Sequence, residues 1–180
     1  MYYALIASLP HLEIGMQHPP SADDFLDSCV PYIKQEELDC LRVLLHRNGA
    51  QSTHIFATQW RDIEIQLTNA LALHRAPTYK TDAKKYLQMH RGYRGDIEAK
   101  ATEAIQLSSP QESERCLDDL RWNIAEELIG SHLFGFSKLG AYAIQLHIVL
   151  RWHDLDEQAG RIKLEEIIQQ NTETIDLAEA

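Results

Sequence analysis

The sequence predicts an all-α fold, a bundle of about six to eight helices with a long buried helix near residues 139–153. Apolar residues recur with a 3.6-residue period along most of the chain, which is typical of amphipathic helices. Only eight glycines and six prolines occur in 180 residues, which disfavours a turn-rich β architecture. No segment alternates apolar and polar residues long enough to predict a strand. Only residues 2–9 are ambiguous between helix and extended chain.

The first half of the chain contains three helix signals. Ser21 followed by Asp24 is a variant of the capping box, which predicts a helix start. Leucines at helical spacing predict a second helix from Glu36 to Arg47. A five-turn apolar stripe predicts a third helix over Phe56–His74, and Pro77 is expected to end it.

The second half contains the strongest start signal and the most apolar helix. In residues 109–112 a serine caps, a proline occupies the first helical position and a glutamate lies three residues after the cap. The leucine and isoleucine stripe that follows ends near Gly130. The next helix begins at Ser137 and is apolar on nearly every side up to Trp152, so we interpret it as the central core helix. A partner-binding helix is the alternative interpretation.

We expect one helical domain over residues 1–180, since this length suffices for one well-buried core. Two smaller lobes, residues 1–95 and 96–180, are the alternative. After Gly160 a last helix is predicted, with isoleucine and leucine at positions 162–168 as its apolar members. The acidic tail from Asn171 is expected to fray.

Neither end of the chain predicts export or membrane insertion. The apolar stretch before Pro10 lacks a basic region ahead of it, so it does not resemble a signal peptide. No run of about 18 apolar residues predicts a membrane-spanning helix. Cys29, Cys40 and Cys116 are irregularly spaced, which predicts three buried, reduced thiols. Together these features predict a soluble cytoplasmic protein.

The net charge of −10 is distributed unevenly. Residues 1–95 contain ten acidic and ten basic groups, whereas residues 96–180 contain seventeen acidic and seven basic groups. An acidic chain repels phosphate, so nucleic-acid binding is not expected. One basic cluster stands out, and either a solvated connector between helices or a contact with an acidic partner explains it. The cluster consists of Arg75, Lys80, Lys84, Lys85, Arg91 and Arg94, with Asp82 as its only acid.

No catalytic, cofactor-binding or metal-binding residues are predicted. None of the nine histidines has a histidine four residues away or a glutamate three residues before it, the spacings of helical metal sites. His153 and Glu157 are an isolated pair four residues apart. The chain has neither a glycine-rich phosphate loop nor a Cys-x-x-Cys motif, and no serine has the context of a nucleophile elbow.

Several polar and aromatic residues of the helices have structural interpretations. The acidic pairs Asp118-Asp119 and Glu126-Glu127 are interpreted as parts of solvated helix faces. We expect Arg121 to form a surface ion pair with Asp118 or Glu126, worth less than about 1 kcal/mol. Among the tryptophans, Trp60 is expected in the core, while core and interface are equally good interpretations of Trp122.

Five stretches together resemble a bacterial family described as a domain of unknown function, whose members are encoded beside subunits of V/A-type ATPases. The opening stretch, Tyr-Tyr followed by Leu-Ile-Ala-Ser-Leu-Pro, is the most specific of them. The stretches are Tyr2–Pro10, Pro19–Leu26, Trp60–Asn69 with Leu71, Arg75 and Ala76, Glu112–Trp122, and Tyr142–Gly160.

The resemblance implies a non-catalytic subunit or assembly factor of an ion-translocating V/A-type rotary ATPase. By its genomic setting the family is similar to the C-type stalk subunit (d-type in eukaryotes), a helical socket that joins the central stalk to the membrane ring. The C-type protein is about twice as long and has three helical lobes, so full equivalence is not implied. The expected partners are other components of this ATPase, in the central stalk or the membrane ring, and the expected location is cytoplasmic and peripheral to the inner membrane.

Two other functions are compatible with the residues. One is an enzyme with a pocket between helices, in which His147, Arg151 or His153 supplies the polar groups. The other is a helical adaptor unrelated to ATPases.

Overall fold

The structure, a computed structural model, describes residues 2–46 and 52–155, and in these ranges it is helical without strands. The all-α prediction is therefore confirmed, with the number of helices in the expected range. The elements are α1 (Tyr3–Ser8), α2 (Ala22–Cys29), α3 (Gln35–His46), α4 (Ile55–Arg75), the short 3-10 helix η1 (Ala83–Lys85), α5 (Gly95–Gln106), α6 (Pro110–Glu127) and α7 (Phe136–His153).

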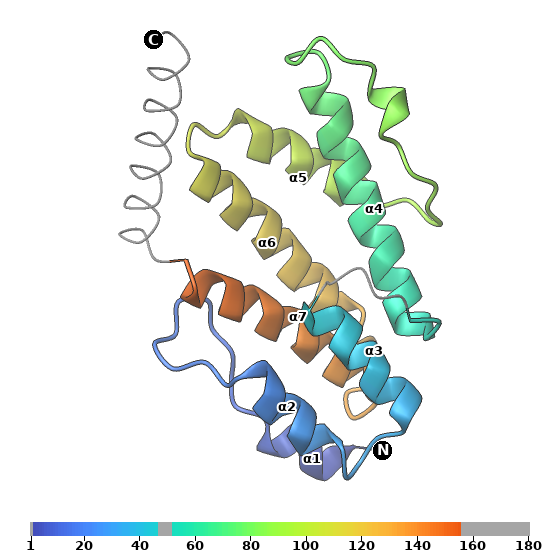
Figure 1. Cartoon of the computed structure of the whole chain (residues 1–180), viewed down its shortest axis with the longest axis vertical. Coiled ribbons are helices and arrows are strands. Elements are labelled where there is room, and N and C mark those ends of the chain that lie inside the picture. The colour runs from blue at the N-terminus through green and yellow to red at the C-terminus, as the bar shows by residue number, and fades with distance from the viewer. Residues whose placement is uncertain (1, 47–51, 156–180) are drawn as a thin grey trace, which may run out of the picture.

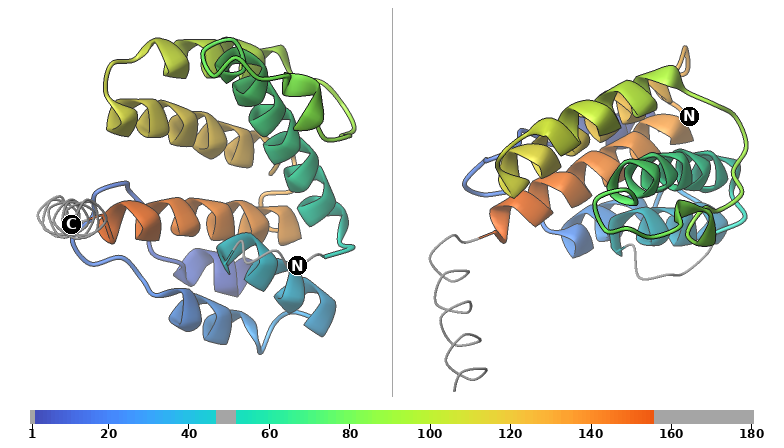
Figure 2. Two further views of the ribbon diagram at one scale, coloured as in Figure 1. Left: turned by 45° about the horizontal axis from the view of Figure 1, so that its top comes forward. Right: turned by 90° about the horizontal axis from the view of Figure 1, so that it is seen from above.

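α7 is the central helix, as the apolar run predicts. It packs against α3, α4 and α6, and it has more buried residues than any other described helix. Figure 2 shows α7 between α6 on one side and α1, α2 and α3 on the other. Leu146 is fully buried at its middle. Because partners cover α7 on several sides, its apolar residues surround the helix instead of forming one stripe.

Helix starts and ends follow the local chemistry of the sequence. The Ser21 side chain accepts a hydrogen bond from the backbone N–H of Asp24 at 3.0 Å, and Ser109 accepts one from Glu112 at 3.4 Å. After α6 the chain turns at Gly130, whose φ of 58° lies in the left-handed region that favours glycine. The capping signals read from the sequence are therefore confirmed at both serines.

The N-terminal segment forms a helix, which resolves the ambiguity of residues 2–9. Its two ends are attached to different helices. The Tyr2 hydroxyl donates to Glu37 Oε1 in α3 at 2.6 Å, while the carbonyl of Pro10 accepts from the Tyr142 hydroxyl in α7 at 3.1 Å. Burial, together with the Glu37 carboxylate, raises the pKa of Tyr2 to about 12. The most specific stretch of the family resemblance thus fastens the chain start onto the core.

α5 is the element that the sequence analysis does not predict. Its buried face consists of Ile97, Ala101 and Ala104, which are too small and too few to form an obvious apolar stripe. Residues 76–94, which we call the connector, join α4 to α5 and run along the outside of α4 (Figure 1).

Some expectations lie outside the described residues or stay predictions. The end of the second predicted helix at Arg47, the last helix at positions 162–168 and the tail from Asn171 fall outside the described ranges. The choice between one domain and two lobes also stays a prediction. Across the described ranges, no helix is long and apolar enough to cross a membrane.

Candidate functional site

A buried carboxylate at the middle of α6 organises the main polar cluster of the core. Asp118 is only 1% exposed. Its Oδ1 accepts a hydrogen bond from Arg121 Nη1 at 2.9 Å, and its Oδ2 accepts from Trp152 Nε1 at 2.7 Å and from Arg151 Nη2. A buried carboxylate of this kind needs such partners, because burying a charge without compensation is strongly unfavourable.

Arg121 links this cluster to α4. Its Nε donates to Glu64 Oε1 at 2.9 Å, and the arginine and glutamate side chains are both largely buried. Burial alone would lower the pKa of Arg121, but the carboxylates of Glu64 and Asp118 more than offset it and raise that pKa. Arg121 therefore keeps its positive charge inside the protein.

The two carboxylates and two guanidinium groups at the centre of the cluster balance each other and connect three helices. Glu64 comes from α4, Asp118 and Arg121 from α6, and Arg151 from the end of α7. Glu114 adds a longer contact of 3.3 Å to Arg151 at the rim. We call these five residues and Trp152 the Asp118 network. Both oxygens of Asp118 are occupied by donors, so this arrangement holds helices in register rather than presenting a carboxylate to a substrate.

The network corrects two expectations of the sequence analysis. Asp118 does not lie on a solvated face, and the Arg121 pair is buried rather than at the surface. α6 packs against both α5 and α7, so its buried face is wider than its apolar stripe. Glu126, the other expected partner of Arg121, instead accepts from Gln145 Nε2 at 2.8 Å.

A signal for the network is present in the sequence. Asp118, Arg121 and Ala125 are spaced by three and four residues, so they form a second stripe beside the apolar one. A charged pair within such a stripe can be buried when a third helix supplies counter-charges, which the sequence of α6 alone does not reveal.

The three residues suggested for an enzymatic pocket do not all line one cavity among the described residues. Arg151 belongs to the Asp118 network, and His153 is exposed beside Asp154. His147 and Arg151 line a hollow of about 10 Å³, which is room for about one water molecule.

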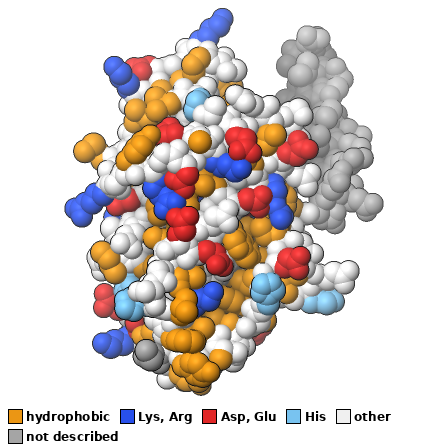
Figure 3. All heavy atoms as spheres, turned by 180° about the vertical axis from the view of Figure 1, so that it is seen from behind, with side chains coloured by type: hydrophobic (Ala, Val, Ile, Leu, Met, Phe, Trp, Pro, Cys, Tyr) orange, Lys and Arg blue, Asp and Glu red, His pale blue; other side chains and the backbone are white. Residues whose placement is uncertain are grey.

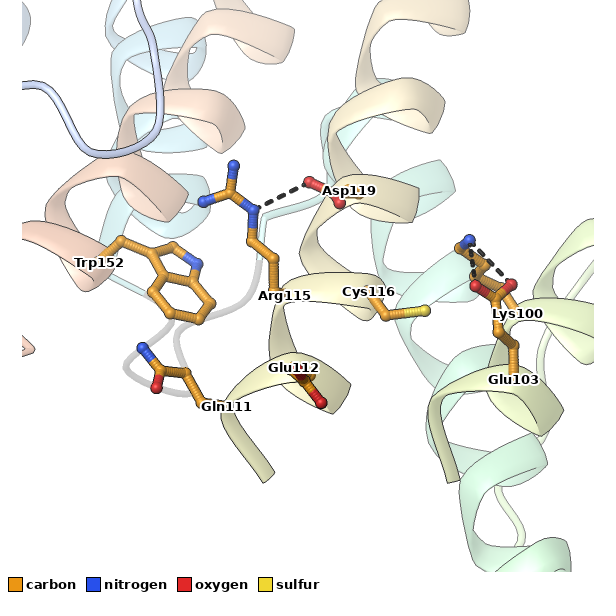
Figure 4. A pocket seen from close by; sticks show the side chains of 8 residues that line it. All are labelled: Lys100, Glu103, Gln111, Glu112, Arg115, Cys116, Asp119 and Trp152. Carbon is orange, nitrogen blue, oxygen red and sulfur yellow. Dashed lines mark hydrogen bonds and ion pairs between the residues drawn. The ribbon is translucent and has the colours of Figure 1, made fainter. Parts of the chain in front are cut away.

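A groove of about 480 Å³ lies between α5, α6 and the end of α7 (Figure 4). Its charged groups largely pair with each other. Lys100 Nζ lies 2.9 Å from Glu103 Oε2, and Arg115 Nε lies 3.3 Å from Asp119 Oδ1. The groove is lined by Lys100, Glu103, Gln111, Glu112, Arg115, Cys116, Asp119 and Trp152.

Aromatic and thiol groups complete this groove. The Arg115 guanidinium lies 5.6 Å from the centre of the Trp152 ring, within range of a cation–π interaction. Burial raises the pKa of the Cys116 thiol, so the group is neutral near neutral pH. The groove therefore offers paired ions and an aromatic wall but no activated nucleophile.

The structure also shows the environments of the cysteines and of two tryptophans, and it bears on metal binding within the described residues. All three cysteines are buried and unpaired, and Trp60 lies in the core, as predicted. Trp122 is partly buried against the core. In residues 2–46 and 52–155 no three histidine, cysteine or acidic side chains are grouped as metal ligands.

The comparisons with known proteins concern mainly the second half of the chain. Residues 100–175 match the family described as protein of unknown function (DUF2764). This match begins within α5 and covers α6 and α7, so it contains every member of the Asp118 network except Glu64. No curated protein and no solved structure shows significant similarity.

The match supports an uncharacterised domain family, which agrees with the resemblance to a domain of unknown function. Its description states neither an activity nor a partner. The link to V/A-type ATPases stays a prediction.

Proposed function

We propose that this chain is a non-catalytic helical component or assembly factor of a V/A-type rotary ATPase, acting through protein contacts in the manner of the C-type stalk protein. The proposal draws its identity from the five matching stretches of the sequence. The structure adds the physical properties that such a role requires.

The observation that carries the proposal is the Asp118 network. Charged side chains from α4, α6 and α7 form hydrogen bonds with one another. Directional guanidinium–carboxylate pairs resist sliding of one helix along another better than apolar contacts alone. A body that joins moving or assembling proteins has to keep its shape, and this core supports that requirement.

Two of the places where apolar side chains are exposed lie apart from each other, which suits a protein that contacts more than one partner. At one place Tyr3, at the start of α1, and Phe134, just before α7, pack with ring centres 4.9 Å apart, and both are exposed. The other place is the connector beside α4. Figure 1 shows α1 and the connector at opposite ends of the molecule.

Affinity purification from the native organism tests the proposal. The tagged chain is expected to bring down ATPase subunits of the A, B, D, F or I type from gently solubilised membranes. A tagged variant with a disrupted core, Leu146→Asp, serves as the control for nonspecific capture. If none of these subunits accompanies the folded chain, the ATPase assignment is wrong.

A further inference from the structure

The connector is held in a defined conformation although only η1 within it is regular. Gln66 Nε2 in α4 donates to the carbonyl of Arg94 at 2.8 Å, and the N–H of Arg94 donates back to Gln66 Oε1 at 3.1 Å. Asn69 makes the same pair of hydrogen bonds with Gln88, at 2.8 and 2.9 Å. Two side-chain amides, one turn apart on α4, therefore hold the connector backbone as a neighbouring strand would.

The large apolar side chains of the connector are exposed to solvent. Met89 is 96% exposed, Tyr79 75% and Tyr93 73%, and Tyr86 and Leu87 are exposed as well. Single exposed apolar residues are common on protein surfaces, but five of them are clustered in the short segment from Tyr79 to Tyr93. The fold leaves Tyr79, Met89 and Tyr93 largely uncovered.

The same segment contains exposed cations that the described residues do not neutralise. Lys80, Lys84, Lys85 and Arg91 are exposed and form no ion pair within the described ranges. Arg94 differs, because it pairs with Asp96 at 2.6 Å and Glu127 at 2.7 Å. Asp82, the only acid among them, caps the backbone of Lys84 at 3.0 Å. Figure 3 shows the molecule from behind, with basic and apolar side chains together at the upper left, at the end where α4 meets the connector.

We propose that the connector is a docking surface for an acidic face of a protein partner, with the tyrosines and Met89 as its apolar centre. This inference deepens the proposed function and rests on it for the identity of the partner. Tyrosine, methionine and arginine are enriched at protein interfaces, and lysines around such a centre select an acidic counterpart. The two amide pairs order the connector before binding, which reduces the entropy lost on association.

The composition of the surface favours a protein over a membrane or a nucleic acid. Three of the five exposed apolar residues are tyrosines, whose hydroxyls need hydrogen-bond partners when buried. The chain as a whole carries a charge of −10, which repels anionic lipid and polyphosphate alike. An acidic protein face that meets only the connector avoids most of this repulsion.

Site-specific photo-crosslinking in the native organism tests the inference. A photoreactive benzophenone amino acid replaces Tyr86 or, as the control, Tyr32, which is also exposed but lies between α2 and α3. The position of Tyr86 is expected to give one dominant protein adduct that is absent at Tyr32, and its cross-linked peptide is expected to be rich in Asp and Glu. Charge reversal by Lys84→Glu/Lys85→Glu is expected to reduce the adduct about tenfold.

A matched variant separates local from global charge. Lys34→Glu/Arg61→Glu changes the net charge by the same amount at exposed positions outside the connector, and it is expected to leave the adduct unchanged. Far-UV circular dichroism and urea denaturation verify that both variants fold. Vesicles of anionic phospholipid and a single-stranded RNA are added to the purified protein as direct probes of the other partner classes.

The outcomes distinguish this inference from the proposed function. An acidic adduct with an ATPase subunit supports both, and an acidic adduct with another protein supports the docking surface while the ATPase assignment fails. No dominant protein adduct at Tyr86, an adduct with a second copy of this chain, or an adduct insensitive to charge reversal overturns the docking surface. Saturable binding of the vesicles or the RNA through Lys84 and Lys85 overturns it too.

Discussion

Asp118 and Asp119 are neighbours of the same type with opposite environments. Asp118 is buried among three donors, while the Asp119 side chain is 52% exposed and, within the described residues, pairs only with Arg115. The difference arises because α7 covers one side of α6, and the Asp119 side is left at the open groove. This adjacent pair provides an internal comparison of buried and exposed ion pairing.

Replacing Asp118 by Asn should destabilise the protein by about 3 kcal/mol or more, because Arg121 and Arg151 would lose their shared counter-charge. Asp119→Asn should cost less than about 1 kcal/mol, since an exposed pair is weakened by solvent. Urea denaturation of the two variants measures both values. Similar small losses for the two would show that the Asp118 network is not a structural centre.

Alkaline pH should destabilise the protein through Cys29 and Cys40. Burial raises the pKa of each thiol from 9.0 to about 11. Because the pKa of each thiol is higher in the folded protein than in the unfolded chain, the contribution of the thiols to the free energy of unfolding is complete below pH 9.0. This contribution is lost as the pH rises toward 11. Between about pH 8 and pH 10 we expect a loss of about 1 kcal/mol per thiol, measured by urea denaturation with a reductant present.

The double variant Cys29→Ala/Cys40→Ala is the control for this effect. Its stability should fall less than that of the original protein over the same pH range, although it starts lower because two cavities are created. An equal fall in both proteins would mean that other groups cause the alkaline loss.

Residue environments could be predicted from the sequence where composition decides them. The burial of Cys29, Cys40 and Trp60 follows from their chemistry and from helical spacing, and the structure confirms it. The burial of Asp118 could not be predicted in this way, because its counter-charges come from α4 and α7. Contacts between distant segments decide the environment of a charged residue on a helix.

Among the elements, α4 and α7 approach closely at Gly140. A Cβ built there would lie 2.5 Å from Cε1 of Phe56, which is itself buried. Only a residue without a side chain leaves room for the Phe56 ring at this position. Nothing in the sequence of α7 distinguishes Gly140 from a flexible glycine.

Gly140→Ala should therefore destabilise the protein by about 1–3 kcal/mol through overpacking against Phe56. Gly95→Ala, at the start of α5, is the matched control, because no atom lies within 4 Å of its Cβ and alanine favours helix. Thermal denaturation followed by circular dichroism compares the two. An unchanged melting temperature for Gly140→Ala would contradict the close approach of α4 and α7.

The sequence predicts elements that have strong caps or large apolar residues. Ser21 and Ser109 mark the starts of α2 and α6, and the apolar run marks α7. The sequence pattern does not predict α5, because Ala101 and Ala104 provide much of its buried surface and alanine adds little to an apolar stripe. The defined conformation of the connector is not predicted either, since it depends on hydrogen bonds from the side-chain amides of Gln66 and Asn69.

At the scale of the whole molecule, we propose a helical body that acts by contacting partners rather than by catalysis. The groove between α5, α6 and the end of α7 contains mutually paired ions, and both carboxylate oxygens of Asp118 are occupied by donors. The basic connector has no glycine-rich loop to hold a polyphosphate.

The purified protein should accordingly not bind Mg-ATP. A charge of −10 and the lack of a phosphate loop both disfavour a polyanionic ligand. Isothermal titration is expected to give no saturable heat. Stoichiometric binding at micromolar affinity would instead favour an enzymatic or regulatory function.

The most direct measurement is purification of the V/A-type ATPase from the native organism through a tag on one of its catalytic subunits. Mass spectrometry then quantifies this chain in the intact complex and in its assembly intermediates after size-exclusion chromatography. A stalk component should be present at a fixed ratio to the catalytic subunits in the intact complex, and an assembly factor should be enriched in the intermediates. Absence of the chain from both fractions would contradict the proposed function.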